Sequence, residues 1–346
     1  MRLLIITQVV DQNDSDLGFF HRWIEEFAKH CEKVSVICLF EGAHTLPANV
    51  QIYSLGKEKY KGPSFIFLRR WEYAKRFWRL AAHLRLEYDT VFVHMNPEYV
   101  VLGTLLWKAW GKRVGLWYMH KSVTYSLRFA ALFADVIFTA SKESIRIRAS
   151  HIQIMGHGID VARFTAGHSP RVSEVRIVTL GRISRSKGLL DMLAALDVLH
   201  MRGVPFSFTI AGAPMTEEDK EYLREVQAAI ARRPYAPRVG MHGPIRYDRV
   251  SEFLRDADVF LNLSRTGSLD KAGLEALIAG VPLVSSNQAF RPILPSQLFV
   301  SNTPEEIAEA IERAVDLDVS SLSRSVREQH SVEGLIAKIV ARYEVQ

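Results

Sequence analysis

The sequence predicts an α/β protein of two domains, each built around a parallel sheet. Its 346 residues correspond to two domains at roughly 100–200 residues per domain. Short apolar runs alternate with helical patterns, which is typical of parallel strands covered on both faces. The pattern restarts after a polar segment with glycine and proline, Ala166–Ser173, which predicts a linker.

The first domain is expected over residues 1–168. Its predicted strands are Arg2–Thr7, Lys33–Leu39, Thr90–His94, Arg113–Tyr118, Asp135–Thr139 and Ile152–Met155. Its predicted helices are Phe19–His30, Ser64–Arg85, Tyr99–Trp110 and Lys142–Arg148. A last helical pattern, Val332–Tyr343, predicts a C-terminal helix that joins this domain within 332–346.

The second domain is expected over residues 172–325. Its predicted strands are Val175–Leu180, Ser207–Ala211, Arg238–Met241, Val259–Leu263 and Val281–Ser285. The helices between them are Leu189–Arg202, Glu217–Arg232, Tyr247–Asp256 and Lys271–Ala279. Two Rossmann-like domains facing a cleft are therefore expected, with functional residues in the turns after the strands, because open α/β sheets bind ligands beyond the carboxyl ends of their strands.

Composition narrows the class further. Apolar residues make up 48% and charged residues 24%, the balance of a globular protein. No apolar run approaches the ~18 residues of a membrane span, and the first one is too short for a secretory signal. Cys31 and Cys38 are expected to be reduced core residues, which predicts a cytoplasmic location. The histidines and cysteines lack the spacing of metal ligands, so no metal is expected.

Positive charge is concentrated in one segment. Between Lys57 and Glu87, nine basic and three acidic residues give +6, which equals the net charge of the whole chain. This favours a local anionic partner and not nucleic acid along the molecule.

The first candidate site is the loop GRISRSKG, from Gly181 to Gly188. It follows a predicted strand and presents Arg182 and Lys187 just before a helix. Two cations near a helix N-terminus suit a diphosphate. A solvated basic loop is the alternative.

The second candidate site follows a later strand. The segment Thr266–Gly267–Ser268 offers backbone N–H groups to phosphate oxygens. Glu275 lies in an otherwise apolar helix, where an unpaired carboxylate is costly. It is expected to bind a sugar hydroxyl, and a structural ion pair is the alternative.

Together these segments resemble the retaining glycosyltransferases of family 4, which have the GT-B fold. The resemblance lies in GRISRSKG, IAGAP at 210–214, HGPI at 242–245, ADVFLNLS at 257–264 and LEALIAGVPLV at 274–284. The segment GHGID at 156–160 is similar to the N-G-I/V-D segment of the family.

The resemblance implies that Arg182 and Lys187 bind the diphosphate of a nucleotide sugar and that Glu275 binds its ribose. The same donor site would include Ile245, Gly267, Ser268 and Leu269 and, from the first domain, Gly18, whose missing side chain would let a loop approach the diphosphate. A glycine required by a tight turn is the alternative for Gly18. His120 would point toward the transferred sugar; a hydrogen-bonded structural histidine is the alternative.

One motif position departs from the family. The first glutamate of its E-x7-E motif is replaced by Gly267. Asp270 is the nearest acidic substitute, and its two possible roles are a catalytic carboxylate and a helix N-cap.

The implied function is retaining transfer of a sugar from a nucleotide-diphosphate donor to a glycan or lipid-linked acceptor, in cell-surface polysaccharide or glycolipid synthesis, without a metal cofactor. A GT-B epimerase and a non-catalytic sugar-nucleotide-binding relative are the alternatives. A nicotinamide oxidoreductase ranks last, because no G-x-G-x-x-G follows a strand.

The basic segment 57–88 raises a further expectation. Phe67, Trp71, Ala74, Trp78 and Ala81 share one face of the predicted helix, and the arginines lie mostly on its other faces. Such a helix is typical of an anionic membrane surface, and predicts a peripheral position on the inner face of the cell membrane. An ordinary domain helix with its aromatic face in the core is the alternative.

Overall fold

The computed structural model describes residues 1–14, 17–59, 66–164 and 173–344. The chain divides into two compact units, Met1–Gly158 with His330–Gln346 (unit 1) and Ile159–Gln329 (unit 2). Each unit is a parallel sheet with helices on its faces, so the prediction of two parallel-sheet α/β domains is confirmed. All of the predicted linker except Ser173 lies outside the described residues.

Unit 1 contains a seven-stranded parallel sheet in the order β3-β2-β1-β4-β5-β6-β7. The strands are β1 (Arg2–Val10), β2 (Lys33–Glu41), β3 (Val50–Ser54), β4 (Thr90–His94), β5 (Arg113–Trp117), β6 (Val136–Thr139) and β7 (Ile152–Ile154). The central strands are apolar runs buried on both faces, as expected for a covered parallel sheet.

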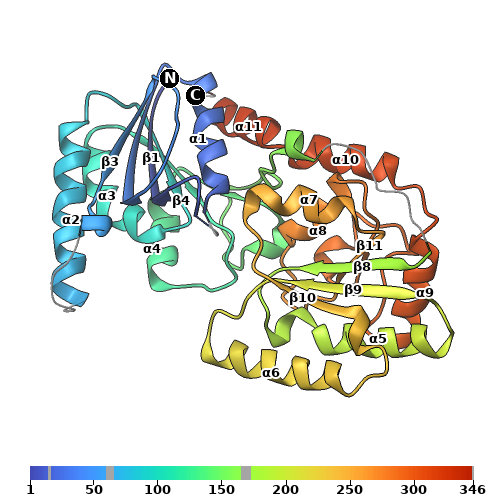
Figure 1. The fold of residues 1–346 in the computed structure, drawn as a ribbon. Helices are drawn as coiled ribbons and strands as arrows, with labels where there is room; N and C mark the ends of the chain where they lie inside the picture. The colour runs from blue at the N-terminus through green and yellow to red at the C-terminus, as the bar shows by residue number, and fades with distance from the viewer. Residues whose placement is uncertain (15–16, 60–65, 165–172, 345–346) are drawn as a thin grey trace. The chain divides into compact units, whose positions relative to one another are not determined.

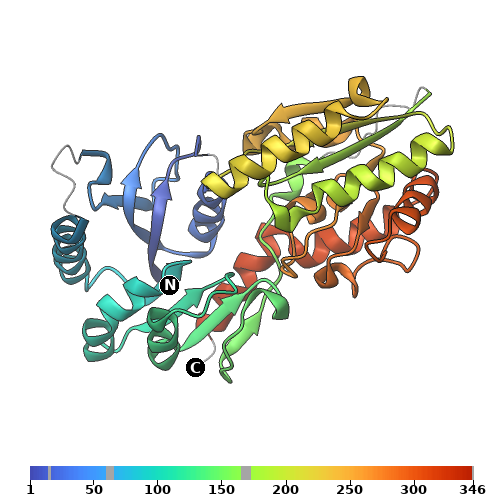
Figure 2. The same ribbon diagram turned by 90° about the horizontal axis from the view of Figure 1, so that it is seen from below.

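Helices cover both faces of this sheet. Helix α1 (Phe19–His30) packs beside α11 (Val332–Glu344), although they come from opposite ends of the chain (Figure 1). The opposite face carries α2 (Ile66–His83), α3 (Pro97–Ala109) and α4 (Tyr125–Phe133), which follow one another along the sheet (Figure 2). Each face has its own apolar core.

Unit 2 contains a five-stranded parallel sheet in the order β10-β9-β8-β11-β12. Its strands are β8 (Val175–Leu180), β9 (Phe206–Ala211), β10 (Val239–Gly243), β11 (Val259–Asn262) and β12 (Leu283–Ser285). Its helices are α5 (Leu189–Met201), α6 (Glu217–Ala231), α7 (Val250–Arg255), α8 (Lys271–Ile278), α9 (Pro304–Ala314) and α10 (Ser320–His330). The turns that follow β8 and β11 carry most of the predicted site residues.

One predicted helix is wrong. The segment Lys142–Arg148 forms only a 3-10 turn, Lys142–Ser144, and then continues without helix. Ile145 is buried, whereas Arg146 and Arg148 are exposed, an alternation that suits extended chain. Strand β3 and helices α4, α9 and α10 were not predicted.

The expected membrane face of α2 needs correction. Ala74 and Ala81 are buried in unit 1, and the indole nitrogen of Trp78 donates a hydrogen bond to the Leu102 carbonyl at 2.8 Å. This part of the face therefore packs on the protein. Leu68 and Trp71 are 64% and 53% exposed. No helix among the described residues is both long and apolar enough to cross a membrane.

Candidate functional site

The loop after β8 is shaped by glycines. Gly181 has a φ of +150° and Gly188, which begins α5, has a φ of +70°, conformations that favour glycine. A Cβ atom on Gly212 would lie 1.8 Å from the Gly181 carbonyl oxygen, so the loops after β8 and β9 touch through their backbones. This packing fixes the path of the chain that presents Arg182 and Lys187.

Arg182 is held by an acidic partner at the start of α6. Its Nη2 lies 2.6 Å from Oδ2 of Asp219, which also forms a capping box with Thr216. Burial opposes ionisation of Asp219, but hydrogen bonds from Arg182 and from the Met215 and Thr216 backbone outweigh it and lower the pKa of Asp219. The guanidinium remains about half exposed, so its outer edge can meet an anion.

Lys187 is paired across the sheet edge. Its Nζ lies 2.9 Å from Oδ1 of Asp270, which precedes α8. Asn262, the last residue of β11, donates a hydrogen bond to the other carboxylate oxygen at 2.7 Å. Asp270 occupies the N-cap position but makes no capping hydrogen bond with its side chain, so a capping role for the carboxylate is wrong. The carboxylate instead faces the basic loop.

The turn that contains Gly267–Leu269 is anchored at both ends. The Arg265 N–H donates to the Ser186 carbonyl at 2.8 Å, which joins this turn to the basic loop. Asn287, which is buried, donates from Nδ2 to the Ser268 carbonyl at 2.8 Å. Gly267 has a φ of +63°, which suits glycine at the position where the family places a glutamate.

Glu275 is buried in α8, as its apolar surroundings predict, with only 3% of its surface exposed. Its Oε1 has no hydrogen-bond partner among the described residues, and the nearest cation is the Lys271 Nζ at 3.5 Å. Burial raises the pKa of Glu275, and Lys271 only partly offsets this. A buried carboxylate with an unsatisfied oxygen is available to accept a hydrogen bond from a ligand.

Lys271 connects Glu275 to a residue that the sequence did not single out. The Lys271 Nζ lies 4.0 Å from the ring centroid of Tyr247, and Arg163 contacts the same ring at 5.0 Å. Arg163 in turn pairs with Asp160 at 2.9 Å. A single tyrosine in the polar segment before α7 gives no sequence signal that it contacts Lys271 and Arg163. Asn262 and Asn287 could have been found from the sequence, because each is an amide at or near the end of an apolar strand.

Two of the remaining predicted residues belong to the other unit. Gly18 and His120 belong to unit 1. At Gly18 a Cβ would lie 2.5 Å from the Asp14 carbonyl oxygen, which accounts for the glycine by packing. His120 is exposed after β5, and its ring meets the Tyr118 ring edge-on at 5.9 Å.

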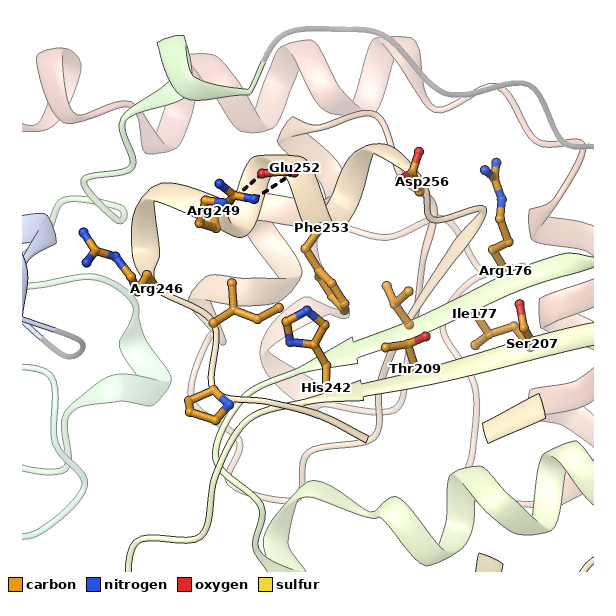
Figure 3. Close-up of a pocket in the computed structure, with 13 residues that line it drawn as sticks. Arg176, Ile177, Ser207, Thr209, His242, Arg246, Arg249, Glu252, Phe253 and Asp256 are labelled. Atoms are coloured by element: carbon orange, nitrogen blue, oxygen red, sulfur yellow. Dashed lines mark hydrogen bonds and ion pairs between the residues drawn. The ribbon is translucent and has the colours of Figure 1, made fainter. Parts of the chain in front are cut away.

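Ile245 borders a groove of about 610 Å³ between β8–β10 and α7. Figure 3 shows His242 and Phe253 facing each other in it, with the Arg249–Glu252 ion pair at its rim. The arginines that line this groove are all paired with carboxylates. Arg182 and Lys187 on the basic loop are paired with carboxylates in the same way, so ion pairing does not distinguish the groove from the loop.

A much smaller cavity, of about 10 Å³, is lined by Gly181, Arg182, Lys187 and Asn262, among others. This volume accommodates about one water molecule. A diphosphate at the basic loop must therefore contact its open side. Among the described residues, no group of three or more His, Cys, Asp or Glu side chains is placed to hold a metal ion. Metal independence stays a prediction.

The two parallel sheets and their connections define a GT-B fold. The structure superposes on the sucrose-phosphate synthase of Thermosynechococcus elongatus with a TM-score of 0.74, at 13% identity and covering 99% of this chain and 98% of that one. The lipopolysaccharide outer core galactosyltransferase WaaB gives a TM-score of 0.67 at 14% identity, with both chains fully covered. At these identities the likeness concerns the fold alone.

Residues 174–316, within unit 2, match the family model described as glycosyl transferases group 1. The chain is 31% identical over 183 residues to glycogen synthase of Mycobacterium tuberculosis, covering 51% of this chain and 43% of that protein. It is 24% identical over 176 residues to a GDP-mannose:cellobiosyl-diphosphopolyprenol alpha-mannosyltransferase of Xanthomonas campestris, covering 51% and 45%. The alignments thus span less than half the length of these relatives.

Proposed function

We propose that the protein transfers a sugar from a nucleotide-diphosphate donor to a glycan or lipid-linked acceptor, with retention at the anomeric carbon. Unit 2 binds the donor, and unit 1 binds the acceptor. The observation that carries this proposal is the position of Arg182 and Lys187 on the loop after β8, within a domain that matches the glycosyl transferases group 1 model.

The donor diphosphate would bind the open side of this loop. Arg182 keeps its contact with Asp219 and offers its exposed edge, whereas Lys187 exchanges Asp270 for a phosphate oxygen. The N–H groups of the 267–269 turn add neutral donors. These groups would stabilise the charge that develops on the leaving diphosphate, which is the main contribution that a preorganised site makes to such a transfer.

Two further roles follow from the contacts within unit 2. The unsatisfied Oε1 of Glu275 would accept a hydrogen bond from a ribose hydroxyl, which compensates for the burial of the carboxylate. Asp270, released from Lys187 by the diphosphate, would face the transferred sugar in place of the glutamate that Gly267 replaces. His120 would act on the same sugar from unit 1.

The acceptor class is inferred from the relatives and from the basic segment. One relative is named for transfer to a diphosphopolyprenol-linked sugar and another, in Homo sapiens, for transfer to phosphatidylinositol. On α2, the exposed Leu68 and Trp71 lie beside Arg69 and Arg70, a combination suited to an anionic membrane surface. We therefore infer a cytoplasmic protein at the membrane surface. Co-sedimentation with anionic vesicles at low salt tests membrane binding. The combined substitutions Arg69→Glu, Arg76→Glu and Arg79→Glu should abolish the co-sedimentation.

A thermal-shift screen of nucleotide sugars tests the donor assignment. A donor at about 100 times its dissociation constant adds about 2.7 kcal/mol of stability, a shift of about 5–10 °C for a unit of this size. Nucleoside diphosphates should reproduce most of the shift, and Arg182→Gln with Lys187→Gln should remove it. A screen in which no nucleotide sugar shifts the wild type would contradict the proposal.

The second candidate function is sugar-nucleotide binding without transfer. The observation that favours it is Gly267, which stands at the position of the first glutamate and supplies no carboxylate. Its φ of +63° is a conformation that favours glycine. Such a protein would show the donor shift but no release of nucleoside diphosphate in the presence of any acceptor.

A further inference from the structure

Unit 1 contains a cavity of about 470 Å³ that the donor site does not account for. It lies between α2, α3 and the carboxyl-terminal ends of β1, β2 and β4. From β1 the chain adds β2 and β3 on one side of the sheet, and then crosses over to add β4 to β7 on the other side of β1. This is the switch point of the sheet, where open α/β folds bind their ligands.

The cavity is lined by more positive than negative charge. Lys57, Arg69 and Arg70 contribute three cations, and Glu98 contributes one carboxylate, whose Oε1 accepts a hydrogen bond from the Ser126 hydroxyl. The net charge of the lining is therefore +2, from three cations less one carboxylate.

Two of the three cations at this cavity differ from neighbouring cations on α2. Lys75 pairs with Glu72, and Arg76 donates to the Leu55 carbonyl at 2.8 Å. Lys57 and Arg70 are exposed, and neither forms an ion pair with any residue in the described ranges. Unneutralised cations that converge on one cavity attract an anion and bind phosphate oxygens strongly.

Two polar side chains that line the cavity, Gln8 and Asn96, hydrogen-bond to each other. Gln8 donates from Nε2 to Oδ1 of Asn96 at 2.8 Å, across the gap between β1 and β4, and Asn96 donates to the His94 carbonyl at 3.0 Å. Met95, between His94 and Asn96, has a φ of +64° and is the one non-glycine residue with positive φ in the described chain. Such strain persists where the surroundings impose it, and it concentrates at binding sites.

We propose that this cavity binds a phosphate group of the acceptor. Lys57, Arg69 and Arg70 hold the phosphate, and the Gln8–Asn96 amide pair faces the hydroxyls of the sugar attached to it. The inference rests on the proposed function, because it names the acceptor of that transfer as a phosphate-bearing sugar, either free in solution or attached to a lipid.

Binding assays with defined probes test the proposal on the full chain. Isothermal titration with glucose 6-phosphate should show binding that glucose does not, and Lys57→Gln with Arg70→Gln should weaken it by about tenfold or more. The control, Arg128→Gln with Arg148→Gln, removes the same charge from two exposed positions of unit 1 outside the cavity. It should change the affinity for glucose 6-phosphate less than threefold. Circular dichroism of each variant checks that it is folded.

A second arm separates the two sources of phosphate. Phosphatidylcholine vesicles with and without phosphatidic acid are mixed with the same proteins. Binding of glucose 6-phosphate alone identifies a soluble acceptor. Vesicle binding that requires phosphatidic acid and Lys57 with Arg70 identifies a lipid-linked one. The proposal is overturned if neither probe binds, or if the cavity and control variants behave alike.

Donor binding is measured in parallel, so that the two proposals fail separately. If a nucleotide sugar binds through Lys187 while Lys57 and Arg70 have no effect on either phosphate probe, the acceptor inference alone is wrong. If no nucleotide sugar binds, the proposed function fails, and a phosphate bound at the cavity is then not an acceptor.

Discussion

The Lys187 ammonium lies 2.9 Å and 3.0 Å from the two carboxylate oxygens of Asp270, although the residues belong to turns that follow different strands, β8 and β11. Both side chains are largely shielded from solvent. The pair thus neutralises a cation that a diphosphate would otherwise meet directly, so donor binding must exchange one anion for another.

Replacing Arg182 or Lys187 by glutamine should weaken donor binding without unfolding the protein. Each charge-assisted hydrogen bond to phosphate contributes about 1.5–3 kcal/mol, or about ten- to a hundredfold in affinity. Isothermal titration calorimetry measures this loss of affinity, with the nucleotide sugar identified in the thermal-shift screen as the ligand. Arg185→Gln is the matched control, because Arg185 lies on the same loop but does not line the small cavity that Arg182 and Lys187 line. Equal losses in Arg185→Gln and Lys187→Gln would show only a diffuse charge effect.

Asp270→Asn should reduce turnover while leaving donor binding intact or stronger. The substitution removes the competitor for Lys187, and since the carboxylate makes no capping bond, the stability of α8 should change little. Single-turnover transfer and donor affinity are measured side by side. Full turnover in Asp270→Asn would mean that no carboxylate replaces the one missing at Gly267.

Glu275→Gln should stabilise the free protein and weaken donor binding. The pKa of Glu275 is raised by burial, so at neutral pH its ionised form is unfavourable in the fold, and a neutral amide should raise the free energy of unfolding by about 1 kcal/mol. Thermal denaturation with and without donor measures both effects. A purely structural ion pair with Lys271 predicts the reverse: lower stability and unchanged donor affinity.

His120→Ala should reduce transfer far more than donor binding, because His120 lies in unit 1 and the loops proposed to bind the donor lie in unit 2. The ratio of turnover to donor affinity, compared with wild type, measures this. The control is His44→Ala, also a histidine of unit 1, which contacts Glu41. Wild-type turnover in His120→Ala would return this residue to a structural role.

Unit 1 should lose stability as the pH falls below about 6.5. Burial lowers the pKa of His94 to about 3 and that of His330 to about 4, so in this range the unfolded chain binds protons that the folded unit does not. The free energy of unfolding should therefore fall by about 1.4 kcal/mol per pH unit for each histidine between pH 6.5 and its folded pKa.

Tryptophan fluorescence in urea measures this loss selectively, because all six tryptophans lie in unit 1. His94→Gln should remove about half of the pH dependence above pH 4. The exposed His83 supplies the control, since His83→Gln should leave the slope as it is. A slope unaffected by His94→Gln would contradict the assignment.

The sequence by itself determined the two sheets and the place of the basic loop Gly181–Gly188. Buried strands such as β1 and β11 contain uninterrupted apolar runs, Leu3–Ile6 and Val259–Leu261, so local composition is enough to find them. The burial of Glu275 was predicted in the same way, because its neighbours in the sequence of α8 are apolar. Edge strand β3 escaped prediction because its half-exposed residues carry a weak pattern.

Only the tertiary structure decided which side chains meet. The contacts of Lys187 with Asp270, Gln8 with Asn96 and Lys271 with Tyr247 join residues from separate turns, and no local pattern encodes such distances. It also decided which face of α2 is buried. Ala74 and Ala81 are buried, and Phe77 belongs to an apolar core of unit 1, whereas Leu68 and Trp71 remain exposed. An amphipathic helix fits a protein core or a membrane equally well by its period alone, and only its neighbours decide between them.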